Sequence, residues 1–321
     1  MYRVVQLSLL GSILSNLLLV LGCSCFLGGL RYKIQTFTTV SGSVNPGLLL
    51  LATSGLALPA ALKLSGQIDG GKERENRDTL EFSRCCGLIM LCMYGGYLYF
   101  SLKTNLFEYE EKEKGKTEQE EERGLLDKGT EGEEVGGKPS APLPPPPFPL
   151  DPDDELTLTY GCALKWLCLI TALISVLSDV LIGTIEGFTH DNNVNPVFVA
   201  AVVIPIMGNA AEHAASVMFA WKGKIDISVA ICVGSSIQIA LCVLPACVTI
   251  GWATGREFDM FFEGYETVTL VLSVVVVSFL LQGGTSNWLA GAMLGGLYVM
   301  IAYGFWIHEG EEGEWGEGEG E

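Results

Sequence analysis

The sequence contains few charged residues, and basic residues are a minority of them. Of 321 residues only 17% are charged, and 19 Lys and Arg stand against 37 Asp and Glu. This balance excludes nucleic-acid binding, because the phosphate backbone is bound by cationic side chains. The acidic excess is confined to residues 108–155, with 16 acids and 6 bases, and residues 309–321, with 7 acids and no base. The nearly neutral, apolar remainder argues against a simple globular enzyme.

Cysteine is present, but not in a metal-binding pattern. None of the 10 cysteines forms a Cys-x-x-Cys pair with histidine partners, so a zinc site has no support. All of them fall in or beside apolar stretches, where Cys behaves as a small hydrophobic residue. We therefore expect neither disulfides nor a bound cofactor.

Long apolar runs are what the sequence has in abundance. A membrane-spanning helix needs about 20 mostly apolar residues. Eight stretches meet or nearly meet this length: 5–29, 46–65, 84–103, 160–184, 196–220, 226–252, 262–282 and 286–307. The predicted fold class is an all-α polytopic membrane protein with about eight transmembrane helices. The first run is either such a helix or, with Arg3 before it, a signal peptide.

Two polar segments divide the chain into four parts. Three helices are expected in residues 1–103 and five in 160–308, separated by an acidic and Pro-rich loop over 104–159. The acidic tail 309–321 is predicted to be disordered. The loop is either a disordered linker, or a short Glu/Lys helix followed by an extended polyproline spacer.

Two of the apolar segments, 10–21 and 233–244, resemble each other. The matched residues are Gly11 with Gly234, Ser12 with Ser235, and Ser15 with Gln238. The copies lie five predicted helices apart, an odd number, so they run in opposite directions across the membrane. This is typical of the inverted repeats of secondary transporters, and the alternative is a chance similarity between two apolar helices. The chain begins too close to the first copy for a helix equivalent to 196–220, so we expect the leading helices of the first repeat to be missing.

Glu212 lies about midway along the run 196–220. Placing a carboxylate at the membrane centre costs at least about 2.5 kcal/mol, so its presence there indicates a functional role. Asn209 shares a helix face with Glu212, and Gly208 lies where an interrupted helix would free backbone carbonyls. A carboxylate, an amide oxygen and free carbonyls suit a hard cation such as Ca²⁺.

Neighbouring residues extend this candidate site. Ser235 and Gln238 on the next helix are expected to add neutral oxygens, and His213 titrates near neutral pH. A carboxylate that binds either a divalent cation or a proton is an exchange element. The alternative is that Glu212 is only hydrogen-bonded to neighbouring helices and that His213 is a packed core residue.

Other acids within the apolar runs are less informative. Asp179 and Glu186 either line an entrance that attracts cations or lie at the membrane interface. Glu263 and Glu266 are predicted to be interfacial.

The residues around Glu212 resemble a known family. Gly208-Asn-Ala-Ala-Glu-His-Ala214, followed by 222–227 and 234–238, is similar to the second α-repeat of vacuolar Ca²⁺/H⁺ exchangers, the CAX branch of the calcium/cation antiporters. Residues 3–22 are similar to the later half of the first α-repeat. The resemblance covers nearly all of 1–307 apart from the loop. It implies a leading helix and two inverted five-helix repeats, of which the leading helix and the first Gly-Asn-x-x-Glu helix are absent here.

The resemblance also implies residue roles. Glu212 would be the glutamate that exchanges Ca²⁺ for H⁺, Asn209 its α-repeat asparagine, and His213 the histidine tied to proton coupling. The partner helices would line the site with Ser12, Ser15, Ser235 and Gln238. The acidic segment that includes Glu108, Glu110 and Glu111 would concentrate or sense the cation. The resemblance implies a transporter of a vacuolar or other acidic endomembrane, not an enzyme, whose partners are the lipid bilayer, Ca²⁺ and H⁺.

Two hypotheses of different class follow. The chain is either a Ca²⁺/H⁺ antiporter, or a truncated, transport-inactive membrane protein that regulates or assembles with a complete exchanger. One of the two glutamates that normally face each other is absent, so pairing in a homo-oligomer, or with a chain that supplies the missing helix, is a further expectation. Na⁺-coupled exchange is a weaker third interpretation, because His213 beside Glu212 suits protons better.

Overall fold

The computed structural model describes residues 2–37, 39–64, 77–101, 159–192, 194–256 and 258–307. The chain divides into two units, Met1–Cys92 with Trp166–Glu321, and Met93–Lys165. The described part of the second unit is the end of one helix and the start of another. The acidic tail and nearly all of the acidic and Pro-rich loop, with Glu108, Glu110 and Glu111, lie outside the described residues.

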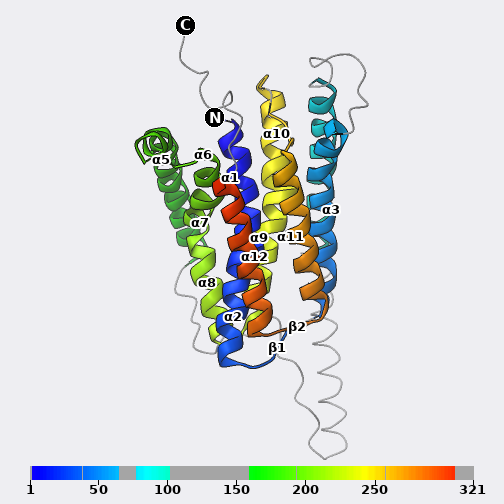
Figure 1. The fold of residues 1–321 in the computed structure, drawn as a ribbon, viewed down its shortest axis with the longest axis vertical. Helices are drawn as coiled ribbons and strands as arrows, with labels where there is room; N and C mark the ends of the chain where they lie inside the picture. The colour runs from blue at the N-terminus through cyan, green and yellow to red at the C-terminus, as the bar shows by residue number, and fades with distance from the viewer. Residues whose placement is uncertain are drawn as a thin grey trace, which may run out of the picture. The chain divides into compact units, whose positions relative to one another are not determined.

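Helices make up nearly all of the described chain (Figure 1). Before the loop they are α1 (Tyr2–Leu14), the π-helical segment η1 (Ser15–Val20), α2 (Leu21–Arg31), α3 (Thr39–Leu64) and a helix over 77–101. After the loop come α5 (Tyr160–Asn192), α6 (Pro196–Phe198), η2 (Val199–Val203), α7 (Ile204–Gly208), α8 (Ala210–Trp221), α9 (Ile225–Gln238), η3 (Ile239–Val243), α10 (Leu244–Ala253), α11 (Gly264–Gln282) and α12 (Trp288–Ile307). The strands β1 (Gln35–Thr36) and β2 (Thr285–Ser286) pair antiparallel.

Five described helices are long and apolar enough to cross a membrane, and a bent pair makes a sixth candidate. Five of the eight predicted runs coincide with the first five: Tyr2–Arg31, Pro46–Leu64, Ile225–Ala253, Gly264–Gln282 and Trp288–Ile307. The run 196–220 coincides with the bent pair, Pro196–Gly208 and Ala210–Trp221. The two other runs, 84–103 and 160–184, are helical where they are described, and Gly161–Leu177 in α5 is an apolar helix shorter than a membrane span. A mostly helical fold with several helices able to span a membrane is therefore confirmed, while the number eight stays a prediction.

The continuous helix α1–η1–α2 carries much of the buried core. Its leucines at 7, 10, 14, 17, 18 and 21 have at most 1% of their surface exposed. It packs against η2 and α7, then against α8 and α9, and finally against α12. Close approach of α2 to α12 depends on small residues, since a Cβ on Gly291 would lie 2.2 Å from the backbone nitrogen of Phe26.

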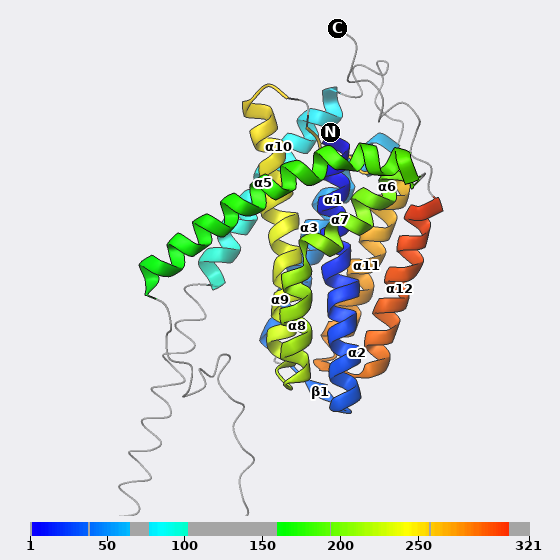
Figure 2. The same ribbon diagram turned by 90° about the vertical axis from the view of Figure 1, so that its left-hand side faces the viewer.

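The helices that contain the two similar segments run antiparallel (Figures 1 and 2). The helix α1–α2 starts at the end of the bundle where α10 finishes, and α9 starts at the end where α2 finishes. Each contains a π-helical segment shortly after its matched glycine, η1 after Gly11 and η3 after Gly234. A π-helical segment inside an α-helix is rare and frequently marks a functional position.

Buried hydroxyl groups join α8 to the neighbouring helices α2 and α9. The hydroxyl oxygen of Ser216 lies 2.9 Å from that of Ser24 in α2 and 2.5 Å from that of Ser228 in α9. The Sγ of Cys232 lies 3.1 Å from the same oxygen. All four side chains are fully or almost fully buried. Hydrogen bonds of this kind hold helices together where apolar burial alone gives no preference for a partner.

The glycine pair of the two similar segments yields a test of this packing. A Cβ on Gly11 would lie 2.0 Å from the carbonyl oxygen of Ala201, whereas a Cβ on Gly234 would meet no atom within 4 Å. We expect Gly11→Ala to lower the free energy of unfolding by about 1–3 kcal/mol through overpacking. Gly234→Ala, the matched control, should be neutral or stabilising by up to about 1 kcal/mol. Thermal unfolding in detergent measures both, and equal melting temperatures would contradict this packing.

Candidate cation site

The site is built around a break between α7 and α8. The helices Pro196–Gly208 and Ala210–Trp221 meet at 56°. Pro205 has no N–H and Gly208, which is exposed, has no side chain, so both weaken helical continuity here. Asn209 departs from helical geometry with φ −94° and ψ 15°, yet its N–H still donates to the carbonyl of Pro205 at 2.9 Å.

The side chain of Asn209 links this break to the first helix. It is 8% exposed, and its amide Nδ2 donates to the hydroxyl of Ser15 at 3.0 Å. The same amide lies 3.4 Å from the backbone carbonyl oxygen of Ser12. Ser15 is fully buried and begins η1. The structure therefore brings together Asn209, Ser12 and Ser15, three of the predicted site residues.

Glu212 lies in the first turn of α8, directly after the break, and is half-buried. A negative charge is favourable at this position because the N-terminal end of a helix carries partial positive charge. Both ion pairs among the described residues involve Arg3, so no described cation partners the Glu212 carboxylate. Its oxygens are therefore available to a cation or a proton.

The ring of His213 is hydrogen-bonded to the backbone at the break. Its Nδ1 lies 2.7 Å from the backbone carbonyl oxygen of Asn209. A carbonyl oxygen only accepts hydrogen bonds, so Nδ1 carries the proton and Nε2 of the neutral ring is left as an acceptor. Nε2 is buried and has no hydrogen-bond partner in the part of the chain that the structure describes.

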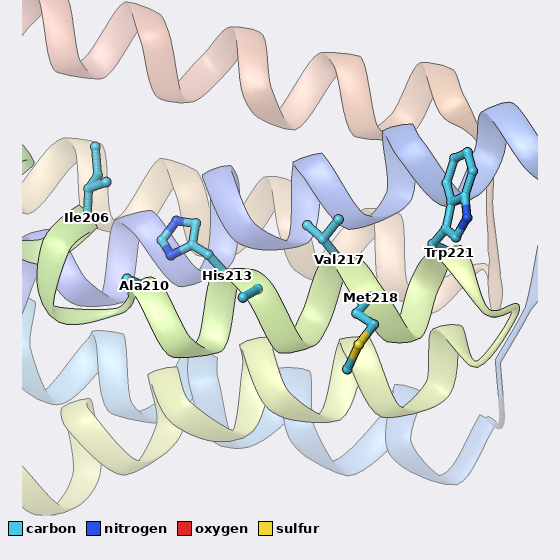
Figure 3. A pocket seen from close by; sticks show the side chains of 7 residues that line it. Ile206, Ala210, His213, Val217, Met218 and Trp221 are labelled. Atoms are coloured by element: carbon cyan, nitrogen blue, oxygen red, sulfur yellow. The ribbon is translucent and has the colours of Figure 1, made fainter. Parts of the chain in front are cut away.

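His213 also lines an open groove of about 630 Å³ on α7 and α8 (Figure 3). Figure 3 shows its ring on the same side of the helix as Ile206 and Val217. The other lining residues are also apolar or aromatic: Ala210, Ala214, Met218 and Trp221. His213 is thus the only ionisable side chain among the residues that line this groove.

A second link joins the first helix to α9, through a residue that sequence reasoning did not select. Asn16 is fully buried, and its Nδ2 donates to the hydroxyl of Ser235 at 3.0 Å. Its carbonyl oxygen Oδ1 is buried and has no partner within the described residues. The repeat comparison paired Ser15 with Gln238 and so left Asn16 opposite an apolar residue, Ile239. A polar amide within the apolar run 5–29, directly after Ser15, was the sequence signal that could have identified Asn16.

The remaining predicted residues do not join this cluster in the structure. Gln238 is the last residue of α9 and is exposed. Asp179 and Glu186 lie within α5, and their side chains are not among those described. No group of three or more His, Cys, Asp or Glu converges in the described part of the chain as a metal ion would need. Oxygen ligands near Glu212 would therefore come from amide, hydroxyl and backbone groups, which suit a hard cation.

Comparison with known proteins places this arrangement in context. A family model described as sodium/calcium exchanger protein matches residues 2–103 and 163–307. Vacuolar cation/proton exchanger 2 of Oryza sativa subsp. japonica is 41% identical over 312 residues, 96% of this chain and 63% of the relative. Vacuolar cation/proton exchanger 5 of Arabidopsis thaliana is 40% identical over 312 residues, 96% of this chain and 64% of the relative. The chain thus spans less than two thirds of the length of either relative.

Solved structures share the fold. Native YfkE superposes with a TM-score of 0.70 at 27% identity, covering 96% of this chain and 76% of YfkE. A second structure of YfkE, described as a Ca²⁺/H⁺ antiporter protein, gives a TM-score of 0.66 at 27% identity, covering 95% of this chain and 75% of that one. These comparisons confirm the resemblance on which the sequence analysis relied.

The tautomer of His213 is testable directly. In ¹⁵N NMR of the histidine-labelled protein, recorded at a pH that keeps the ring neutral, we expect the proton on Nδ1, because the carbonyl of Asn209 requires a donor there. The chain has only 3 histidines, so the signals are few. The variant His213→Gln identifies the signal by its loss, and a ring protonated at Nε2 would contradict the bond to Asn209.

Proposed function

Because the chain belongs to the sodium/calcium exchanger protein family, we propose that it exchanges Ca²⁺, or another divalent cation, for H⁺ across a membrane. Glu212 binds the cation and the proton in turn. The names of the relatives support exchange of a cation for protons, and the description of YfkE supports Ca²⁺ as the cation. The names of these relatives and of YfkE favour a chain that transports over one that only regulates another exchanger.

The observation that carries the proposal is a half-buried carboxylate without a described cationic partner, placed at a helix break. A buried carboxylate is unfavourable unless a positive charge or a proton neutralises it. Cation and proton therefore compete for Glu212, and each displaces the other. Exchange follows if this competition takes place alternately toward the two sides of the membrane.

The neighbouring groups take supporting roles in this proposal. Asn209 orients the break through Ser15 and the backbone of Ser12, and offers its own amide oxygen to the cation. Ser235, whose hydroxyl accepts a hydrogen bond from Asn16, contributes an oxygen from the α9 side, whereas Gln238 is exposed and lies outside this set. His213, with Nε2 as an acceptor, takes part in proton movement. Acids outside this cluster would attract the cation: Asp179, Glu186, Glu108, Glu110 and Glu111.

The proposed architecture is an inverted repeat of about eight transmembrane helices, three before the loop and five after it. The antiparallel course of the helices that contain Gly11 and Gly234 supports it, as do their π-helical segments. A site at the interface of two inverted repeats is usual in secondary transporters. A second copy of this chain, or another chain that supplies a further carboxylate, is part of the proposal as a partner.

We place the protein in a vacuolar or other acidic endomembrane. Both relatives are named vacuolar exchangers. An acidic interior supplies the proton gradient that drives cation uptake, so the location and the proposed exchange are consistent with each other.

The proposal is tested by pH-gradient-driven ⁴⁵Ca²⁺ uptake into vesicles that contain the full chain. We expect uptake by the native chain and a loss of at least about tenfold in Glu212→Gln, because the amide neither neutralises a divalent cation nor exchanges a proton. Glu81→Gln, an exposed acid on another helix, is the matched control and should transport as the native chain does.

Two outcomes would count against the proposal. A native chain that is folded in the vesicles but takes up no Ca²⁺ rules out exchange by this chain alone. Uptake that is equal in Glu212→Gln and in the native chain rules out Glu212 as the exchanging group.

A further inference from the structure

The segment between α10 and α11 packs against the N-terminal end of α1. Residues 258–263, which we name the cap, have no regular secondary structure, yet every second side chain is buried. Phe258, Met260 and Phe262 are 5%, 0% and 1% exposed. Such burial of an irregular segment means that the cap is held in a fixed place by its neighbours.

Contacts with aromatic rings hold Phe258 and Phe261 of the cap. The ring of Phe258 meets Tyr2 of α1 edge to face, with the ring centroids 6.0 Å apart. The Nζ of Lys63, in the last turn of α3, lies 4.0 Å from the ring centroid of Phe261. The cap thus connects α1 to α3 at this end of the bundle.

Hydrogen bonds hold Asp259 of the cap. Gln6 of α1 is 6% exposed, and its Nε2 donates to the backbone oxygen and to the carboxylate of Asp259, both at 2.9 Å. The same carboxylate accepts the N–H of Phe261 at 3.1 Å. Asp259 therefore folds the cap back toward α1.

The strongest contact is an ion pair that joins α1 to the start of α11. The Nη2 of Arg3 lies 2.6 Å from Oε1 of Glu266 and 2.9 Å from Oε1 of Glu263. Glu266, which the sequence predicted to be interfacial, has no exposed surface, and Oε2 of its carboxylate accepts the N–H of Glu263 at 3.1 Å. Removing one partner of a buried ion pair leaves an uncompensated charge, which is strongly unfavourable.

Arg3 lies on the helix that also carries Ser12 and Ser15 of the candidate site. Arg3 precedes Ser12 by nine residues, which is about 13 Å along a helix. The proposed exchange needs a barrier between the site and each side of the membrane that opens in turn. We propose that the cap is such a gate, and that Arg3 is the latch that holds it closed against α1 through Glu263 and Glu266. This inference rests on the proposed function, because a gate has a role only in a transporter.

The latch is tested by the accessibility of a thiol in the cap. Met260→Cys places a thiol at a fully buried position, and mass spectrometry measures its labelling by a water-soluble maleimide in the full chain. Labelling should be slow with Arg3 present. Arg3→Gln in the same chain should raise the labelling rate at least about tenfold, since Glu266 loses the cation that holds it to α1.

A matched control lies at the other end of the same helix. The guanidinium of Arg31 donates to the backbone oxygen of Trp221 at 3.1 Å. Arg31→Gln should leave labelling at position 260 unchanged, and an equal rise would show general loosening of the helix and overturn the latch. Glu266→Gln should also raise labelling, and the double variant with Arg3→Gln should exceed neither single variant by more than about twofold, because both break one interaction.

Folding of each variant is checked by size-exclusion chromatography and circular dichroism. A folded Arg3→Gln with the native labelling rate overturns the latch. If Arg3→Gln does not fold, Glu263→Gln decides, since this carboxylate is partly exposed and its loss is milder; an unchanged rate there overturns the latch as well.

The labelling needs no cation and no pH gradient, so it separates the two proposals. Ca²⁺ uptake by the native chain together with unchanged labelling in Arg3→Gln would overturn the latch and leave exchange standing. Raised labelling without any Ca²⁺ uptake by the native chain would overturn the proposed exchange, and with it the role of the cap as a gate.

Discussion

Inside a bilayer every backbone polar group must be paired, because no water is there to replace a missing partner. The break at Asn209 satisfies this constraint although the helix bends there. Its carbonyl oxygen receives both the N–H and the ring Nδ1 of His213, and its side chain reaches Ser15 on another helix. The first turn of α8, with Glu212, starts from this arrangement. The position of the carboxylate, the tautomer of the histidine and the contact with η1 all depend on it.

Much of the fold and the centre of the site could be predicted from local signals. Apolar runs of about 20 residues predicted helices long enough to span a membrane, and the cost of a carboxylate in an apolar helix selected Glu212 as the centre of the candidate site. The motif Gly208-Asn-Ala-Ala-Glu-His identified the family. Each of these signals is contained within a short stretch of the chain, so it can be recognised without knowing which helices pack together.

The features that were missed depend on pairs of distant helices. Asn16 gained a role only when Ser235, more than two hundred residues later, was placed beside it. The burial of Glu266 also gave no local signal, because its partner Arg3 lies 263 residues earlier in the chain. The π-helical segments also gave no signal in the sequence, because they depend on how the backbone accommodates neighbouring helices and not on residue type. Glu108 and its neighbours lie outside the described residues, so their predicted role stays a prediction.

The pairing of β1 with β2 has a consequence for biosynthesis. Gln35 lies opposite Ser286, and α2 packs along α12. α2 therefore meets this partner only after α12, much later in the chain, has been made. Until then the small-residue surface around Gly22 and Gly29, which finally receives α12, must be covered by lipid or by a chaperone of membrane insertion. A chain that stops shortly before α12 would therefore leave this small-residue surface without its protein partner.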